Sequence, residues 1–204
     1  PALGGIFFRF ASLGEGLSIF EMGLIAVAFC ISLLLFSFGL VAVNMAIKTQ
    51  RTLKQISFYD FEKVEQYTVK LFSVFFAVFL FSLVANLLLY DYGLHSTFGA
   101  LISLLAALAV VFAPQVIVID NQPAKHVVSM SLSVLSKKCT MFLMYVIVAV
   151  LLLAINSSIF IALGPAIGNF SITQFLAVAV NALFIVPFLE VLKAQIYLSK
   201  YTLL

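Results

Sequence analysis

The side chains in this sequence that could bind a metal ion or act as a nucleophile are few and far apart. The two histidines are His95 and His126, and an uncharged apolar run at 97–119 separates them. Cys30 and Cys139 lie in or beside other apolar runs, so we expect two free thiols. The sequence contains no Gly-rich phosphate loop, no HExxH motif and no nucleophile elbow. It therefore predicts a protein that is not an enzyme and that holds no metal and no cofactor.

One acidic residue, Glu190, lies in a long apolar stretch near the C-terminus. Lys193 follows three residues later, and on a helix this spacing places the two side chains within reach of each other. A proton relay would need further acidic residues in apolar surroundings, whereas the others lie at the ends of apolar runs or between them. We therefore expect an ion pair with Lys193, or a carboxylate that reaches the membrane surface.

The other polar residues within the apolar runs are uncharged. Such side chains either hydrogen-bond to a neighbouring helix, at about 1 kcal/mol per contact, or line a path for a substrate or an ion. We expect the first role and keep the second as the alternative. Two prolines in the same runs each remove a backbone hydrogen bond and should kink their helices. These candidates are Asn44, Asn86, Gln115, Asn156 and Asn181, together with Pro114 and Pro187.

The composition indicates the surroundings in which these residues fold. The 204 residues are 64% hydrophobic and 9% charged. Soluble proteins average about 45–50% apolar and about 25% charged residues. This composition excludes a soluble enzyme and a disulfide-stapled secreted domain, and the net charge of +3 is too small to indicate a nucleic-acid partner. The sequence therefore predicts an integral membrane protein in contact with the lipid bilayer.

Uncharged runs locate the membrane-spanning helices. A bilayer core of about 30 Å requires about 20 apolar residues in a helix. The run at 139–189 is too long for one crossing, and its Gly164-Pro165 and Gly168-Asn169 pairs predict a turn. We predict an all-α, polytopic helical bundle in which residues 1–204 form one membrane domain. Its five transmembrane helices are expected near 22–47, 70–90, 97–119, 140–163 and 172–192.

The lysines and arginines predict the orientation of these helices. All but one of the 11 follow the first, third or fifth span, which places them on one side of the membrane. The positive-inside rule makes this side cytoplasmic, with the C-terminus inside and residue 1 outside. The stretch after Pro1 is too short to cross a membrane, so we expect a further helix before it and six crossings in the full protein. The predicted location is the cell membrane.

The two longer connections on the cytoplasmic side, 48–69 and 120–138, are both predicted to contain helices. The first continues without a helix breaker into the second span. The second is typical of an amphipathic helix at the membrane surface, with Asn121 or Gln122 as its N-cap and Pro123 in its first turn. Three lysines of this segment are expected to contact a partner protein or anionic lipid headgroups, namely Lys125, Lys137 and Lys138.

Two stretches of the sequence resemble a known group of membrane proteins. One is VAVNMAIKTQRTLKQISFYDFEKVEQYTVKLF, and the other is FAPQVIVIDNQPAKHVVSMSLSVLSKKCTMFLMYVIVAVLLL. Their layout, over about residues 20–200, is similar to that of archaeal and bacterial membrane proteins of unknown function related to the membrane domain of glycerophosphodiester phosphodiesterases. The resemblance implies a six-helix membrane domain. The phosphodiesterase domain itself is not in this chain, so the resemblance assigns no catalytic residue.

Two functions are compatible with these features. Uncharged spans, short outer loops and the lack of catalytic motifs favour a non-catalytic membrane subunit, which acts as a scaffold or accessory component of a larger membrane complex. The alternative is a permease-like subunit of a transport system, in which 120–138 is a cytoplasmic coupling helix. Both functions imply other membrane protein subunits as partners.

Overall fold

A computed structural model of the chain describes residues 18–52, 58–90, 92, 95–168 and 170–199, and all regular structure within these residues is helical. The long helices are α2 (Ile19–Thr52), α3 (Phe58–Tyr90) and α7 (Cys139–Ile167). Between α3 and α7 lie the π-helix η1 (His95–Gly99), α4 (Ala100–Ala109), α5 (Ala113–Val118) and α6 (Ala124–Lys137). After α7 come α8 (Phe170–Val180), the π-helix η2 (Asn181–Ile185) and α9 (Val186–Leu198).

The predicted all-α, multi-pass membrane fold is confirmed. Five helical stretches are long and apolar enough to cross a membrane, and each overlaps one of the predicted spans. The predicted helix within 48–69 is present where it is described, since α3 runs from Phe58 into the second span. Residue 1 and the C-terminal residue, whose sides of the membrane were predicted, lie outside the described residues. The five stretches are Phe20–Gln50, Glu62–Tyr90, Thr97–Val118, Cys139–Pro165 and Ser171–Leu198.

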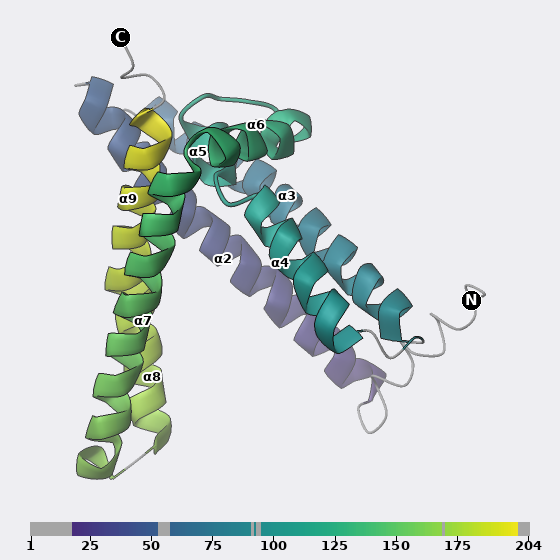
Figure 1. Cartoon of the computed structure of the whole chain (residues 1–204), viewed down its shortest axis with the longest axis vertical. Coiled ribbons are helices and arrows are strands. Elements are labelled where there is room, and N and C mark those ends of the chain that lie inside the picture. The colour runs from purple at the N-terminus through teal and green to yellow at the C-terminus, as the bar shows by residue number, and fades with distance from the viewer. Residues whose placement is uncertain (1–17, 53–57, 91, 93–94, 169, 200–204) are drawn as a thin grey trace.

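The helices form two arms that meet at one end and diverge toward the other (Figure 1). In the first arm α3 packs against α2 and α4, and in the second α7 packs against α8 and α9. Contacts of α2 with α9 and of α6 with α7 join the two arms. We call this joined end the α6 end, and it also contains the end of α2 and the beginnings of α3 and α7 (Figure 1). The described parts of the predicted lysine-bearing segments, which follow the first, third and fifth spans, therefore lie together at this end (Figure 1).

The short helix α5 is the centre of the α6 end. All of its residues, Ala113–Val118, are buried, and it contacts α2, α3 and α6. Its first turn is held by Ser131 of α6, whose Oγ accepts a hydrogen bond from the Phe112 N–H at 3.2 Å. At its other end Lys48 of α2 donates to the Val118 carbonyl at 2.5 Å, where a cation also complements the helix dipole. A helix of six residues is not stable alone, so these contacts hold it.

Replacing Ser131 by alanine should leave the Phe112 N–H without its acceptor in the core. A buried donor without a partner costs about 1–3 kcal/mol, and we expect a loss of this size in the free energy of unfolding. Denaturant titration of the purified protein in detergent measures this loss. Ser133→Ala is the matched control, because Ser133 is exposed on the same helix and should change the free energy of unfolding by less than about 0.5 kcal/mol. Equal effects of the two changes would contradict the role assigned to Ser131.

Pro114 and Pro187 each lie in the first turn of a helix. Pro165 lies inside α7, so the turn predicted from Gly164-Pro165 onward is wrong at that pair and begins only at the C-cap residue Gly168. The chain turns at Val110–Phe112, which ends α4, and α5 then begins at Ala113 with Pro114 in its first turn. The predicted kink within one continuous third helix is therefore wrong, because the span consists of two helices and the missing N–H of Pro114 falls where no helical partner exists. Pro187 lies in the first turn of α9, directly after the π-helix η2, whose wider turn is the irregularity at this point.

The amphipathic helix predicted at 120–138 is confirmed as α6, but its predicted cap is wrong. Pro123 is the N-cap residue, and no side chain caps the helix by a hydrogen bond. Asn121 has a φ of +52° and the Gln122 N–H donates to the Val116 carbonyl at 3.3 Å, so both residues form the turn between α5 and α6. One face of α6 is buried against the bundle, through Val127, Ser131 and Val134.

Candidate functional site

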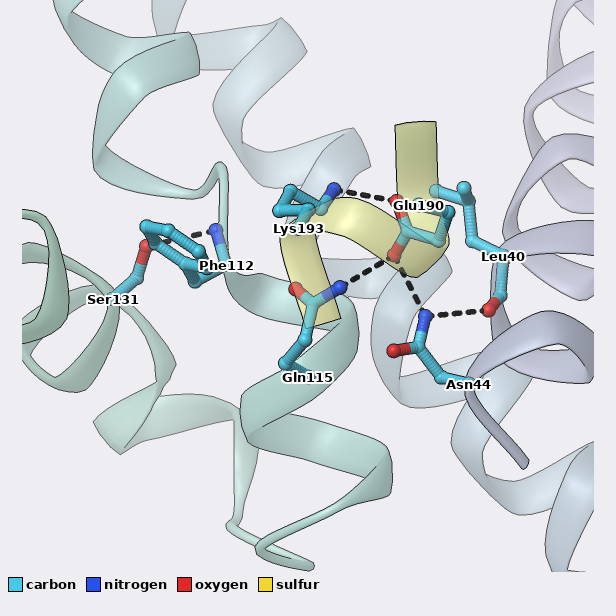
Figure 2. A network of polar contacts seen from close by, with 7 residues as sticks. All are labelled: Leu40, Asn44, Phe112, Gln115, Ser131, Glu190 and Lys193. Carbon is cyan, nitrogen blue, oxygen red and sulfur yellow. Dashed lines mark hydrogen bonds and ion pairs between the residues drawn. The ribbon is translucent and has the colours of Figure 1, made fainter. Parts of the chain in front are cut away.

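Three helices bring four polar side chains together in the core of the α6 end (Figure 2). Asn44 comes from α2, Gln115 from α5, and Glu190 and Lys193 from α9. Asn44 and Gln115 are fully buried, and Glu190 and Lys193 are 3% and 7% exposed. We call these residues the Glu190 cluster. Because charged groups are costly inside a membrane, a buried cluster of this kind is the natural candidate for a functional site.

Glu190 is the acceptor at the centre of the cluster. Asn44 Nδ2 and Gln115 Nε2 both donate to its Oε1, each at 2.7 Å, and Lys193 Nζ lies 2.6 Å from its Oε2. The Asn44 amide also donates to the carbonyl of Leu40, one turn earlier on α2, at 2.8 Å. Hydrogen bonds to an ionised group are about twice as strong as neutral ones. The carboxylate is therefore paired at both oxygens, and its charge is balanced by Lys193.

Two acceptors of the cluster have no partner among the described residues. They are Asn44 Oδ1 and Gln115 Oε1, and both are buried. Figure 2 shows that each amide turns its nitrogen toward Glu190 and its oxygen to the other side. An amide oxygen can accept two hydrogen bonds, and a buried acceptor without any costs about 1–3 kcal/mol. Each of these two oxygens could therefore accept a further hydrogen bond.

The predicted ion pair between Glu190 and Lys193 is confirmed, and the carboxylate is buried within the protein. Asn44 and Gln115 were candidates from their residue types, but they lie 146 and 75 positions from Glu190, so the sequence did not show that all three meet. Pro114 directly precedes Gln115 and lies in the first turn of α5. Of the predicted intramembrane candidates, the structure brings these together and leaves the others outside the cluster.

The remaining amides make contacts between neighbouring helices, as predicted. Asn156 of α7 donates from Nδ2 to Asn181 Oδ1 at 3.0 Å and to the Ala177 carbonyl at 3.2 Å, which ties α7 to α8 and η2. Asn86 of α3 donates from Nδ2 to Ser103 Oγ of α4 at 3.1 Å. These bonds stabilise helix packing within one arm, and none of them involves the Glu190 cluster.

Gly99 allows the close contact around Asn86, and this gives a second prediction. A Cβ added at Gly99 would overlap the side-chain oxygen of Asn86, whereas a Cβ at Gly23 of α2 would meet nothing within 4 Å. Overpacking typically costs about 1–3 kcal/mol, so Gly99→Ala should lower the free energy of unfolding by this amount. Gly23→Ala is the matched control and should stabilise its helix by up to about 1 kcal/mol. A denaturant titration of the detergent-solubilised protein measures both changes. An unchanged free energy of unfolding in Gly99→Ala would refute the close packing.

Several polar contacts of the α6 end were not predicted from the sequence. Tyr197 is fully buried and donates from Oη to Asp120 Oδ2 at 2.6 Å, which joins the end of α9 to the turn after α5. Lys48 and Ser131 hold the two ends of α5, as described above. The signal in the sequence is weak. Lys48, Asp120 and Tyr197 lie at the borders of apolar runs, and Ser131 is one of several serines in the amphipathic segment, so exposure is the usual outcome at each position.

A cavity of about 510 Å³ lies between the arms beside the cluster. One wall is formed by α2 at 35–43 and the other by 178–187 of the second arm. Leu40, whose carbonyl accepts from Asn44, and Pro187, one turn before Glu190, both line it. Asn181 also lines the cavity, but most of the lining side chains are apolar. The cavity therefore suits hydrocarbon, and the Glu190 cluster lies next to it.

The three predicted lysines of the α6 segment lie outside the cluster. Lys125 and Lys137 are exposed in the first and last turns of α6, and Lys138 is partly buried at its C-cap. A second cavity of about 510 Å³, between α3, α4 and the start of α6, includes Lys125 among otherwise mostly apolar lining residues. These positions are compatible with lipid or partner contacts, and the three lysines are not part of the Glu190 cluster.

The described residues contain no group of three or more His, Cys, Asp or Glu side chains that could hold a metal ion. Cys30 in α2 and Cys139 at the start of α7 are free thiols, as predicted. The side chain of His95 is not among those described. No protein-family model matches the chain, and neither does any curated protein or any solved structure.

Proposed function

We propose that this protein is a non-catalytic membrane subunit that acts as a scaffold or accessory component of a larger membrane complex. The observation that carries the proposal is the divergence of the two arms, which touch at the α6 end and separate away from it (Figure 1). The separation leaves an apolar cavity between α2 and the second arm at the depth of the spans. A transmembrane helix of a partner would pack between the two arms and cover this cavity, because small and apolar surfaces favour helix packing in membranes.

The membrane orientation is part of the proposal. We place the protein in the cell membrane with the α6 end, and hence the C-terminus, on the cytoplasmic side, because the lysines gather there. Residue 1 would then lie outside. In this orientation Lys125, Lys137 and Lys138 lie near anionic headgroups of the inner leaflet. The resemblance to prokaryotic membrane domains related to those of glycerophosphodiester phosphodiesterases agrees with a membrane unit that has no catalytic residues.

Purification in a mild detergent followed by native mass spectrometry tests the subunit proposal. We expect other membrane proteins in fixed stoichiometry with this chain. A bulky residue in the cavity wall, such as Gly39→Phe, should release the partner, while Phe175→Ala, at an exposed position on α8, should not. A stable monomer from native membranes, with no associated chain, would contradict the proposal.

A permease-like subunit of a transport system is the second candidate, and the buried Glu190 cluster favours it. Intramembrane charged pairs are typical of transport paths. In this case α6 acts as the coupling helix, because its buried face rests on α5, which carries Gln115 of the cluster. Changing Lys137 and Lys138 together to glutamate should then uncouple a co-purifying ATPase from transport. Unchanged turnover and transport in this variant would eliminate the coupling role.

A further inference from the structure

We propose that the cavity between α3, α4 and the start of α6 binds an anionic phospholipid, with one acyl chain between the helices and the headgroup at Lys125. We call this cavity the α3–α4 cavity. The inference rests on the proposed position of the α6 end at a membrane surface, and it holds for either of the functions above. It assigns an occupant to a cavity that neither function uses.

The α3–α4 cavity lies along two of the membrane spans. It is lined on α3 by residues between Ser73 and Phe81, and on α4 by Ala106 and Ala109. Both stretches belong to segments that are long and apolar enough to cross a membrane. From position 73 to position 81 a helix rises by about 12 Å, so the cavity extends along the span away from the α6 end. Its volume of about 510 Å³ falls within the range of about 300–1,000 Å³ that is typical of ligand pockets.

Small apolar side chains make the α3–α4 cavity suitable for one hydrocarbon chain. Ala77 of α3 lines it together with Ala106 and Ala109 of α4, and most of the other lining residues are valines. Because α3 and α4 pack against each other, the space between them is narrower than the diameter of a helix, which is about 10–12 Å. A flexible acyl chain therefore fits there, whereas a helix of a partner does not. Hydrocarbon in the cavity also supplies the dispersion contacts that an empty space would lose.

Lys125 places a positive charge at the end of the cavity nearest the membrane surface. It lies in the first turn of α6, which contacts α3 and α4 at the α6 end (Figure 1). The Lys125 side chain is exposed, and no ion pair joins it to another of the described residues. Lysines at this depth attract anionic lipid headgroups. A ligand with a negative headgroup and an apolar chain therefore matches both ends of the cavity.

The beginning of α6 adds to this positive potential. No side chain caps α6 by a hydrogen bond, and the N-terminus of a helix carries a partial positive charge. Ala124, the first residue of α6, lines the cavity beside Lys125, so a phosphate at Lys125 also lies near the start of the helix. The helix end alone would accept any anion. It is the apolar cavity next to Lys125 that selects a lipid.

Native mass spectrometry of the purified full chain in detergent, titrated with two phospholipids that have the same acyl chains, tests the proposal. We expect one molecule of phosphatidylglycerol to bind saturably and about fivefold more tightly than phosphatidylcholine, which is the effect of one lysine near a membrane surface. In Lys125→Ala the two lipids should bind with equal affinity. Lys137→Ala is the matched control and should keep the preference, because it removes an exposed lysine from the last turn of the same helix, about 18 Å away.

A second pair of variants tests the place of the acyl chain. Ala106→Phe puts a ring into the α3–α4 cavity and should abolish the saturable binding of both lipids. Ala107→Phe makes the same change at an exposed position of α4 that does not line the cavity, and it should bind both lipids as the unchanged protein does.

Equal affinities of the unchanged protein for the two lipids would overturn the proposal. So would a preference for phosphatidylglycerol that survives Lys125→Ala, or undiminished binding in a folded Ala106→Phe. Because Lys125 is exposed, its replacement leaves the fold intact, and the lysine test decides the matter even where Ala106→Phe does not fold. A chain that binds the lipid in this way but associates with no other membrane protein would contradict the subunit function and leave this inference standing.

Discussion

Replacing Glu190 by alanine is expected to lower the free energy of unfolding by about 3–5 kcal/mol, because it leaves Lys193 as an unpaired charge in the core. The change also removes the acceptor of two amide groups, from Asn44 and Gln115. These partners belong to α2, α5 and α9, so one substitution weakens the contact between the arms as well as the packing of α5. Denaturant titration in detergent measures the loss.

Two further variants separate the unpaired charge from the loss of side-chain volume. The double change Glu190→Leu with Lys193→Met replaces the pair by apolar groups, and it should recover most of the stability that Glu190→Ala loses. Glu62→Ala removes an exposed carboxylate from α3 and should change the free energy of unfolding by less than about 0.5 kcal/mol. An effect of Glu190→Ala no larger than that of Glu62→Ala would show that the pair does not hold the arms.

Phe112→Ala should produce a second large loss, of about 3–5 kcal/mol, because it removes a fully buried ring from the centre of the α6 end. The Phe112 ring lies 6.0 Å from the ring of Phe142 on α7 and 6.1 Å from that of Tyr197 on α9, measured between centroids. The substitution leaves a cavity where the turn before α5 meets the second arm. We expect a lower midpoint in the same denaturant titration.

Phe175→Ala is the matched control for this prediction. Phe175 lies on α8 and is 72% exposed, so in detergent its ring contacts the micelle rather than the protein. Its removal should change the free energy of unfolding by less than about 0.5 kcal/mol. Similar losses for the two phenylalanines would mean that the core of the protein does not lie at the α6 end.

The spans were predictable from the sequence because they depend on a property that every residue in them shares. An uncharged apolar run of sufficient length has few alternatives to a membrane helix. The breaks within the spans were harder to predict from the sequence. Pro114 indicated that the third span is irregular. Whether it kinks one helix or lies at the start of a new one depends on the turn at Val110–Phe112, which has no distinct sequence signal.

The candidate site was only partly predictable, because it depends on contacts between distant segments. The pair of Glu190 and Lys193 follows from their spacing on one helix. The approach of Asn44 and Gln115 to the same carboxylate follows from the packing of α2 and α5 against their neighbours, and no spacing in the sequence encodes it. The sequence therefore identified the members of the cluster but not the cluster.

Labelling of single cysteines from either side of the membrane tests the central claim, that five spans bring the lysine-bearing ends to one face. In a background with Cys30→Ser and Cys139→Ser, cysteines at Lys63 and Lys137 should react with an impermeant maleimide from the same side. A cysteine at Tyr92 or Gly168 should react only from the opposite side. Reaction of positions 63 and 137 from opposite faces would contradict the account.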